Sequence, residues 1–343
     1  MKRRLAIGIF ALLITLIPLS SGIGGGFTPI NDLGTGTYLG FTGGLYPNGN
    51  NTPPASHATI GVTATFAIQP RAVDGAPDPN GKYILLSIGM SNTNQEFCGN
   101  STDGVSCNSW TFMGQAAADS NVNHTTLMLL NGAAGGQVAH TWDSPNDPNY
   151  DRIRDTLLTP LGLSENQVQI VWVKVANPNL FPSLPVGNAD AYLLLNEMGN
   201  IVRALKTRYP HLAQVYFSSR IYAGYATTML NPEPYAYESG FAVKWLIEAQ
   251  IEQMEGGEID PLIGDLAYPD APWLAWGPYL WADGLTPRSD GLFWELADFE
   301  ADGTHPSQSG ETNVGAMLLD FFLNSPQTRC WFKVGEVCGG YTF

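Results

Sequence analysis

Three polar residues in two distant segments have the types and the order that nucleophilic catalysis requires. Ser91 lies in the segment GMSN (residues 89–92), and Asp302 and His305 lie in the segment DGTHPS (residues 302–307). A serine hydroxyl is a weak nucleophile near neutral pH unless an adjacent base removes its proton. His305 is the candidate base, and Asp302 is the candidate for orienting its imidazole. These residue types predict an acyl-transfer site if the fold brings the two segments together.

Attack on an ester carbonyl develops negative charge on its oxygen, so such a site also needs hydrogen-bond donors. The candidate donors are the backbone N–H groups of Ser91 and Gly136 and the side-chain amide of Asn177, with Asn179 as the alternative amide. Gly136 belongs to the segment NGAAGGQ (131–137), and a glycine allows a ligand to approach the backbone closely. Together these groups would form an oxyanion hole.

Three further residues beside these segments are candidates for contacting a substrate: Asn92, Gln137 and Trp142. Asn92 and Gln137 could bind substrate hydroxyls or could instead tie loops together. Trp142 could stack on a sugar ring or fill the core, since aromatic side chains serve both purposes. His140, which is also close by, is better explained as an ordinary hydrogen-bonded histidine than as a second base. Since no Cys or His pair has the tight spacing of a structural zinc site, we predict no metal.

The elements that must position these residues are short apolar runs, most of which end just before a candidate segment. Short β-branched runs bounded by turn residues are typical of strands buried on both faces. Five runs fit this pattern, the last less clearly: Tyr83–Ile88, Thr126–Leu130, Val168–Val175, Ala213–Phe217 and Trp273–Trp281. Apolar residues at helical spacing mark three helices, over residues 194–205, 241–254 and 314–322. This alternation predicts an α/β domain with a mostly parallel sheet, which binds ligands at the carboxyl ends of its strands.

The composition divides the chain near residue 82. Residues 23–81 are rich in Gly, Pro and Asn and predict an irregular arm packed on the body, with one strand at Ala58–Ile68. Residues 82–343 would form the main domain. Two polar segments within it, 95–125 and 222–238, are expected to be insertions. Four tyrosines of the second segment could form a wall of a ligand cleft, although ordinary packing explains each one more simply: Tyr222, Tyr225, Tyr235 and Tyr237.

Residues 1–22 have the pattern of a signal peptide. Lys2, Arg3 and Arg4 precede the apolar run Leu5–Leu19, and small residues follow it. The run is shorter than the roughly 20 apolar residues of a membrane-spanning helix, so an uncleaved anchor is the less favoured alternative. We therefore expect a secreted or periplasmic protein with no stable membrane insertion after cleavage.

The chain has four cysteines, and an even number in an exported chain favours two disulfides over four free thiols. Three pairings are possible. We favour the local one, in which each bond closes a short loop and the second pins the C-terminal tail: Cys98–Cys107 and Cys330–Cys338.

The overall composition limits the classes of partner. The chain has 343 residues, of which 44% are hydrophobic and 11% aromatic, so it can bury a sizeable core. Its 16 Lys and Arg against 31 Asp and Glu give a net charge of −15. Such a surface repels phosphate backbones and anionic lipid headgroups, so nucleic acid is not an expected partner. The few charges and many aromatic residues favour an exported protein that handles neutral polar ligands.

Taken in order, these segments resemble the SGNH hydrolase (GDSL-type esterase) superfamily over residues 82–325. GMSN (89–92) matches the GxSN variant of the first block, which carbohydrate and sialate O-acetylesterases share. The pair Gly135-Gly136 followed by Trp142 is similar to their second block, and DGTHPS (302–307) is similar to the fifth. The third block departs from the family pattern, because its Gly-x-Asn-Asp is absent and Asn177 stands in its place.

The resemblance implies a three-layer α/β/α sandwich with a flavodoxin-like sheet, with Ser91 as nucleophile, His305 as base and no metal or organic cofactor. The chain contains no Gly-x-Ser-x-Gly, the motif of the α/β-hydrolase nucleophile elbow. The implied activity is hydrolysis of short-chain acyl esters, such as O-acetyl groups, on small molecules or polysaccharides. The alternative is a carbohydrate-binding or surface protein that uses an esterase-like scaffold without turnover.

Overall fold

A parallel sheet of five strands forms the centre of the protein. The computed structural model describes residues 26–338 apart from 100, 102, 179, 180, 268, 269 and 337, so the segment predicted as a signal peptide lies outside the described residues. The strand order is β4-β3-β5-β6-β7, and every neighbouring pair is parallel. In chain order this is 2-1-3-4-5, the order of flavodoxin-like sheets. The strands are β3 Tyr83–Gly89, β4 Leu127–Asn131, β5 Val168–Lys174, β6 Gln214–Phe217 and β7 Trp273–Trp276.

The strands are mostly apolar because helices cover both faces of the sheet, although polar residues are also buried in them, among them Gln169, Lys174 and Gln214. Every residue of β3, β5, β6 and β7 is buried, and only the edge strand β4 has half-buried positions. All five predicted runs contain a strand. The last strand is shorter than its run: β7 ends at Trp276, two residues before Pro278, which has no N–H to donate to a neighbouring strand.

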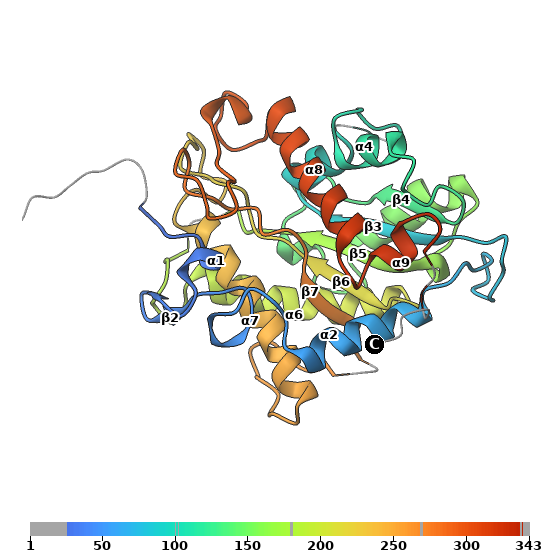
Figure 1. The fold of residues 1–343 in the computed structure, drawn as a ribbon, viewed down its shortest axis with the longest axis horizontal. Helices are drawn as coiled ribbons and strands as arrows, with labels where there is room; N and C mark the ends of the chain where they lie inside the picture. The colour runs from blue at the N-terminus through green and yellow to red at the C-terminus, as the bar shows by residue number, and fades with distance from the viewer. Residues whose placement is uncertain are drawn as a thin grey trace, which may run out of the picture.

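Helices on the two faces complete three layers, as the sequence predicts. The helices α3, α4 and α8 pack together on one face, and α6 and α7 pack against each other on the other. In Figure 1, α4 and α8 lie towards the top of the view and α6 and α7 towards the bottom. No helix within the described ranges is long and apolar enough to cross a membrane. The helices are α1 Ile30–Leu33, α2 Ala55–Ala64, α3 Ser91–Cys98, α4 Phe112–Ala118, α5 Pro148–Arg152, α6 Asp190–Arg208, α7 Tyr235–Met254, α8 Gln308–Asn324 and α9 Arg329–Phe332.

The N-terminal arm contains a helix where the sequence predicts a strand. Residues 55–64 form α2, and the two-residue strands β1 (Thr37–Tyr38) and β2 (Phe41–Thr42) precede it. Gly61 faces the ring of Trp273 in β7 so closely that a Cβ at this position would lie 2.3 Å from it. The Trp273 indole N–H also donates to the carbonyl of His57 (3.0 Å). The prediction of a strand at Ala58–Ile68 is therefore wrong, because packing against β7 selects the helix.

The segment 95–125 is also part of the main fold and not an insertion. It includes α4 and the end of α3, both of which pack against α8. Phe97 and Phe112 have no exposed surface, and their ring centroids lie 4.8 Å apart. The prediction failed because the polar loops on either side of α4 dominate the composition of this segment and conceal the short helices.

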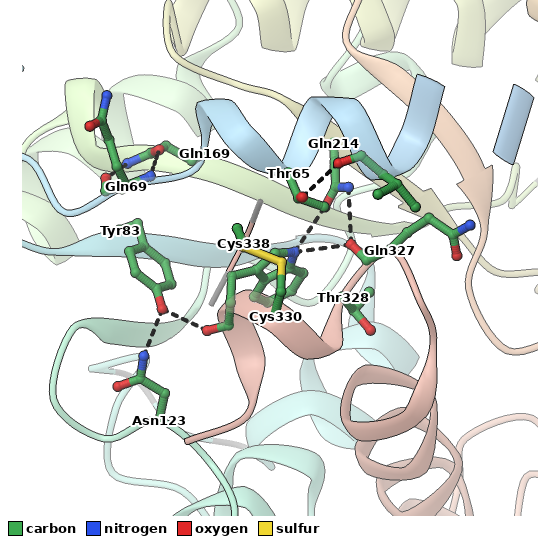
Figure 2. Close-up of a disulfide and its surroundings, with 12 residues drawn as sticks. Thr65, Gln69, Tyr83, Asn123, Gln169, Gln214, Gln327, Thr328, Cys330 and Cys338 are labelled. Atoms are coloured by element: carbon green, nitrogen blue, oxygen red, sulfur yellow. Dashed lines mark hydrogen bonds between the residues drawn. A yellow bond between two sulfur atoms is a disulfide. The ribbon is translucent and has the colours of Figure 1, made fainter. Parts of the chain in front are cut away.

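Both predicted disulfides are present: Cys98–Cys107 and Cys330–Cys338. Figure 2 shows the second one beside α9, next to the amino-terminal ends of the strands. There the hydroxyl of Tyr83, the first residue of β3, donates to the carbonyl of Trp331 (2.6 Å). The C-terminal segment is thus attached at the end of the sheet opposite to GMSN (89–92), which follows the carboxyl end of β3.

Candidate active site

Ser91 lies at the carboxyl edge of the sheet, where β3 ends and α3 begins. Gly89, the last residue of β3, has a φ of 154°, and a Cβ there would lie 2.2 Å from the carbonyl oxygen of Lys174 in β5. Only glycine allows this close passage of the two strands. Ser91 is the first residue of α3, where backbone N–H groups have no acceptor within the helix. The turn therefore presents both the hydroxyl and the N–H of Ser91 at the sheet edge.

A continuous chain of hydrogen bonds joins Ser91, His305 and Asp302. The Ser91 Oγ atom lies 2.9 Å from His305 Nε2, and His305 Nδ1 lies 2.6 Å from Asp302 Oδ2. When Nδ1 carries its proton and donates it to the carboxylate, Nε2 is the nitrogen that can accept a proton from Ser91. The structure thus brings together the three residues that the sequence singled out.

The turn formed by residues 302–307 keeps Asp302 ionised. Its Oδ1 atom accepts the backbone N–H groups of Thr304 (2.9 Å) and His305 (3.0 Å). Partial burial opposes ionisation of Asp302, but the hydrogen bonds from the His305 backbone and ring and from Thr304 outweigh it and lower the pKa of this carboxyl. Gly303 has a φ of 62°, and a Cβ there would lie 2.0 Å from the Tyr225 carbonyl oxygen, so the turn packs tightly against the loop after β6.

A cavity of about 450 Å³ opens beside Ser91 and His305, at the point where the strand order reverses between β3 and β5. Gly136 and Asn177, the other predicted oxyanion donors, both line it. Gly136 has a φ of 75°, with no atom near the position that a Cβ would take. Asn177 is 2% exposed, and no described residue accepts a hydrogen bond from its Nδ2 atom. The alternative amide, Asn179, lies outside the described residues.

Two buried carboxyl groups of α6 lie behind the Asn177 amide. Burial raises the pKa of Asp190 to about 6 and that of Glu197 to about 7, and the nearby amide of Asn177 partly offsets both shifts. No hydrogen bond of ordinary geometry joins the amide to them, since one oxygen of each carboxyl and the Asn177 Nδ2 atom have no partner among the described residues. This side of the cavity is therefore polar, buried and incompletely hydrogen-bonded.

Of the three predicted substrate-contacting residues, only Asn92 lines the cavity. Its amide donates to the carbonyl of Thr304 (3.0 Å) and so links the two candidate segments. Gln137 does not line the cavity, and its side-chain oxygen accepts from the Asn149 amide (2.7 Å), which ties loops together. Trp142 has no exposed surface, so it fills the core, and the prediction that it stacks on a sugar does not agree with its burial.

The four tyrosines of segment 222–238 do not line the cavity. Tyr222 and Tyr237 pack against the ring of Trp281 instead, with centroid distances of 6.0 and 4.7 Å. His140, expected from the sequence to be an ordinary hydrogen-bonded histidine, does line the cavity. In the described part of the chain, no three or more His, Cys, Asp or Glu side chains gather as metal ligands.

Two buried polar residues of the cavity were not predicted from the sequence: Arg220 and Asn231, which are 2% and 3% exposed. Arg220 follows β6 by three residues, so the rule that residues after each strand face the ligand would have found it. Asn231 has a φ of 58°, and the Asn-Pro pair that it opens predicts a turn without indicating a ligand.

A buried ion pair beneath the site was also missed. The ammonium group of Lys174 in β5 contacts both carboxylate oxygens of Glu96 in α3, and neither side chain is exposed. Burial lowers the pKa of Lys174 and raises that of Glu96, and the attraction between them opposes both shifts. The Thr93 hydroxyl donates to the Lys174 carbonyl (2.6 Å). These contacts attach α3 to β5 and so hold Ser91 in place. The sequence did contain a signal for this ion pair, namely Lys174 within the mostly apolar run Val168–Val175.

No protein-family model and no curated protein matches the chain. Among solved structures, a chain of Parabacteroides merdae described as a GDSL-like lipase is similar, with 11% identity and a TM-score of 0.39 over 74% of this chain and 97% of the other. A chain of Bacteroides fragilis described as an acylhydrolase has 14% identity and a TM-score of 0.38, covering 79% of this chain and 98% of its own. A family two carbohydrate esterase from Cellvibrio japonicus has 14% identity and a TM-score of 0.37, covering 74% of this chain and 63% of the esterase.

Proposed function

We propose that this protein is a secreted serine esterase that hydrolyses short-chain acyl esters. The observation that carries this proposal is the unbroken hydrogen-bond chain from Ser91 through the His305 ring to Asp302, between segments 214 residues apart. The cavity beside this chain supports it, because a substrate carbonyl placed there would meet Ser91, Gly136 and Asn177.

In the first half of the reaction, Ser91 Oγ bonds to the carbonyl carbon of the ester while His305 Nε2 takes its proton. The π electrons of the C=O bond move to the oxygen, whose negative charge is received by the Ser91 N–H, the Gly136 N–H and the Asn177 amide. Asp302 stays ionised and stabilises the imidazolium. The intermediate then collapses, the bond to the alcohol oxygen breaks, and His305 gives its proton to the departing alcohol.

In the second half, water replaces the alcohol. His305 takes a proton from the water as its oxygen bonds to the acyl carbon of the Ser91 ester. The second intermediate collapses with cleavage of the bond to Ser91 Oγ, which receives the proton back from His305. The products are the free acid and the regenerated enzyme. A donor of the oxyanion hole is worth about 3–4 kcal/mol where one has been removed from another hydrolase.

The substrate class follows from the motif resemblance and the size of the cavity. The segment GMSN (89–92) and the Gly135-Gly136 pair are similar to those of carbohydrate O-acetylesterases, which supports an O-acetyl group as the acyl part. A volume of about 450 Å³ admits a small acyl group together with part of its alcohol. Since Trp142 is buried, it gives no support to a sugar platform. The two disulfides fit an extracellular protein.

Hydrolysis of 4-nitrophenyl acetate by the wild type and by Ser91→Ala tests the proposal. We expect Ser91→Ala to lower kcat/KM by about 10³-fold or more, because the acyl-enzyme cannot form. Ser56→Ala is a matched control, since this exposed serine of α2 donates a hydrogen bond to Glu255 and is absent from the cavity lining, from which it is also far in sequence. A fluorophosphonate should label the wild type at Ser91 and leave Ser91→Ala unlabelled. Equal rates in the wild type and Ser91→Ala would instead favour a carbohydrate-binding or surface protein without turnover.

A further inference from the structure

Arg220 lines the cavity beside Ser91 with its side chain almost fully buried. It follows β6 by three residues and is 2% exposed. Within the described residues, no group accepts a hydrogen bond from its Nε or Nη2 atom. Buried guanidinium N–H groups without a protein acceptor are paired by water or by a ligand. Both atoms are buried, so Arg220 can bind an acceptor in the cavity that it lines once the side chain turns this edge toward it.

Three carboxylates act on Arg220 electrostatically, but none of them forms a hydrogen bond with its Nε or Nη2 atom. Each is held by other donors. Glu96 binds the Lys174 ammonium. Glu233 accepts from the Trp281 indole and from the backbone N–H groups of Ala223 and Tyr237. Asp302 accepts from Thr304 and His305. The three carboxylates offset part of the charge of Arg220 and leave its hydrogen-bonding capacity unfilled.

The two unpaired atoms of Arg220 define the shape of the missing acceptor. Nε and Nη2 lie on the same edge of the planar guanidinium, so their N–H bonds are parallel. This edge matches the two oxygens of a carboxylate, which it binds in a bidentate manner. A single hydroxyl oxygen could accept both N–H bonds only at bent angles, and it would bring no negative charge to the guanidinium. The unpaired edge therefore favours a planar anion with two oxygens over a neutral polar group.

Asn231 provides a second unpaired group in the same cavity. It is 3% exposed, and its Oδ1 and Nδ2 atoms form no hydrogen bond of ordinary geometry with a described residue. The Asp190 carboxyl lies near this amide, which partly offsets the rise of the Asp190 pKa on burial. Its φ of 58° is left-handed, a conformation that asparagine tolerates better than most residues. The loop after β6 thus places the Asn231 amide on the same cavity wall as Arg220.

We propose that Arg220 and Asn231 form a subsite for a carboxylate carried by the ester substrate. This rests on the proposed esterase function and narrows its substrate class to esters of acidic molecules. β6 lies two strands from β3, about 10 Å away at the usual strand spacing, so the carboxylate would lie several bonds from the reacting carbonyl. The net charge of −15 repels anions at long range, so any selection for them must come from local donors.

Two pairs of esters test this subsite, because the members of each pair differ by one negative charge. 4-Acetoxybenzoate and its methyl ester place the charge on the alcohol side of the scissile bond. Mono(4-nitrophenyl) adipate and its methyl ester place it on the acyl side. The readout is the ratio of kcat/KM for the charged ester to that for the neutral ester. Comparing this ratio between wild type and variants cancels the intrinsic reactivities of the esters.

In the pair that presents its carboxylate to the subsite, we expect Arg220→Gln to lower the ratio at least 10-fold. We expect Arg220→Lys to lower it less, because it keeps the charge and loses the bidentate edge. Asn231→Gly keeps the left-handed backbone without the amide and should lower the ratio about threefold. Asn48→Gly is the matched control, since Asn48 has a φ of 62° and lines a separate cavity under the N-terminal arm.

An unchanged ratio in Arg220→Gln for both pairs would overturn the subsite while leaving the esterase intact. If Arg220→Gln does not fold, an unchanged ratio in Asn231→Gly has the same meaning. If the wild type cleaves none of the four esters, the esterase proposal fails, and calorimetry on Ser91→Ala then decides the subsite. The subsite is supported if Ser91→Ala binds 4-acetoxybenzoate more tightly than its methyl ester and the double variant with Asn231→Gly does not. Equal binding of the two esters would exclude it.

Discussion

The two walls of the cavity differ in how completely their polar groups are paired. On one wall, the side chain of Ser91 binds the His305 ring, and Asp302 behind this wall binds the other ring nitrogen and receives two backbone N–H groups. On the other wall, Asn177 and Arg220 keep side-chain donors that no described residue accepts. Both walls stand on the carboxyl ends of the same parallel sheet, so the contrast does not come from the fold.

The contrast separates groups that are ordered by the protein from groups that await a substrate. A complete hydrogen-bond network holds the proposed nucleophile and base in position before any ligand arrives, as preorganised catalysis requires. An unpaired buried donor costs about 1–3 kcal/mol, and an acceptor on the substrate or the developing oxyanion recovers it. We therefore expect substitutions on the paired wall to disable the chemistry, and substitutions on the other wall to change which substrates react and how well.

Breaking the paired wall should give the largest effect. Asp302→Asn keeps the size of the side chain but places an NH₂ group or an uncharged oxygen against His305 Nδ1. The imidazolium then loses its charged partner and the ring can take the wrong tautomer, so we expect kcat to fall about 10²–10⁴-fold. Steady-state kinetics with 4-nitrophenyl acetate measure this. Asp320→Asn, an exposed position on α8, is the control. A loss below threefold in Asp302→Asn would show that Asp302 is not needed.

A single donor of the other wall should matter less. Asn177→Ala removes one of three proposed oxyanion donors, so we expect kcat to fall about 10²-fold with little change in KM. Because the Asn177 Nδ2 atom has no partner in the described structure, its removal should leave thermal stability nearly unchanged. A large drop in melting temperature with unchanged kcat would show that Asn177 is structural and would point to the alternative amide, Asn179.

The sequence predicted the sheet because each strand is specified locally. β3 and β5 are mostly apolar runs with turn residues at their ends. They form strands whichever element packs against them. The helix α2 was missed because its conformation depends on the ring of Trp273, more than 200 residues away. The alternation of threonine and apolar residues in α2 suggests a strand, whereas Thr59 and Thr63 in fact donate to carbonyl oxygens four residues earlier.

The candidate site was predictable where a motif exists. Ser91 and His305 lie in the motifs GMSN (89–92) and DGTHPS (302–307), whose order along the chain points to a site. Arg220 carries no motif and resembles any surface arginine in the sequence. Only the packing of the loop after β6 shows that it is buried. Trp142 shows the opposite case, because a motif position indicated a ligand and the structure places the ring in the core.

The smallest effect expected concerns the carboxyl of Glu197 behind the incompletely paired wall. Burial raises its pKa from about 4.5 to about 7, so between these values the folded protein holds a proton that the unfolded chain has released. Stability should therefore fall as pH rises through this window, and Glu197→Gln should remove that fall. We expect the variant to be more stable than the wild type by about 1–3 kcal/mol at pH 8 and no more stable at pH 4.5, measured by chemical denaturation.

Glu258→Gln, at an exposed position, is the control. Parallel pH curves for the wild type and Glu197→Gln would mean that this carboxyl is well solvated, and the difference between the two walls would then rest on Asn177 and Arg220 alone.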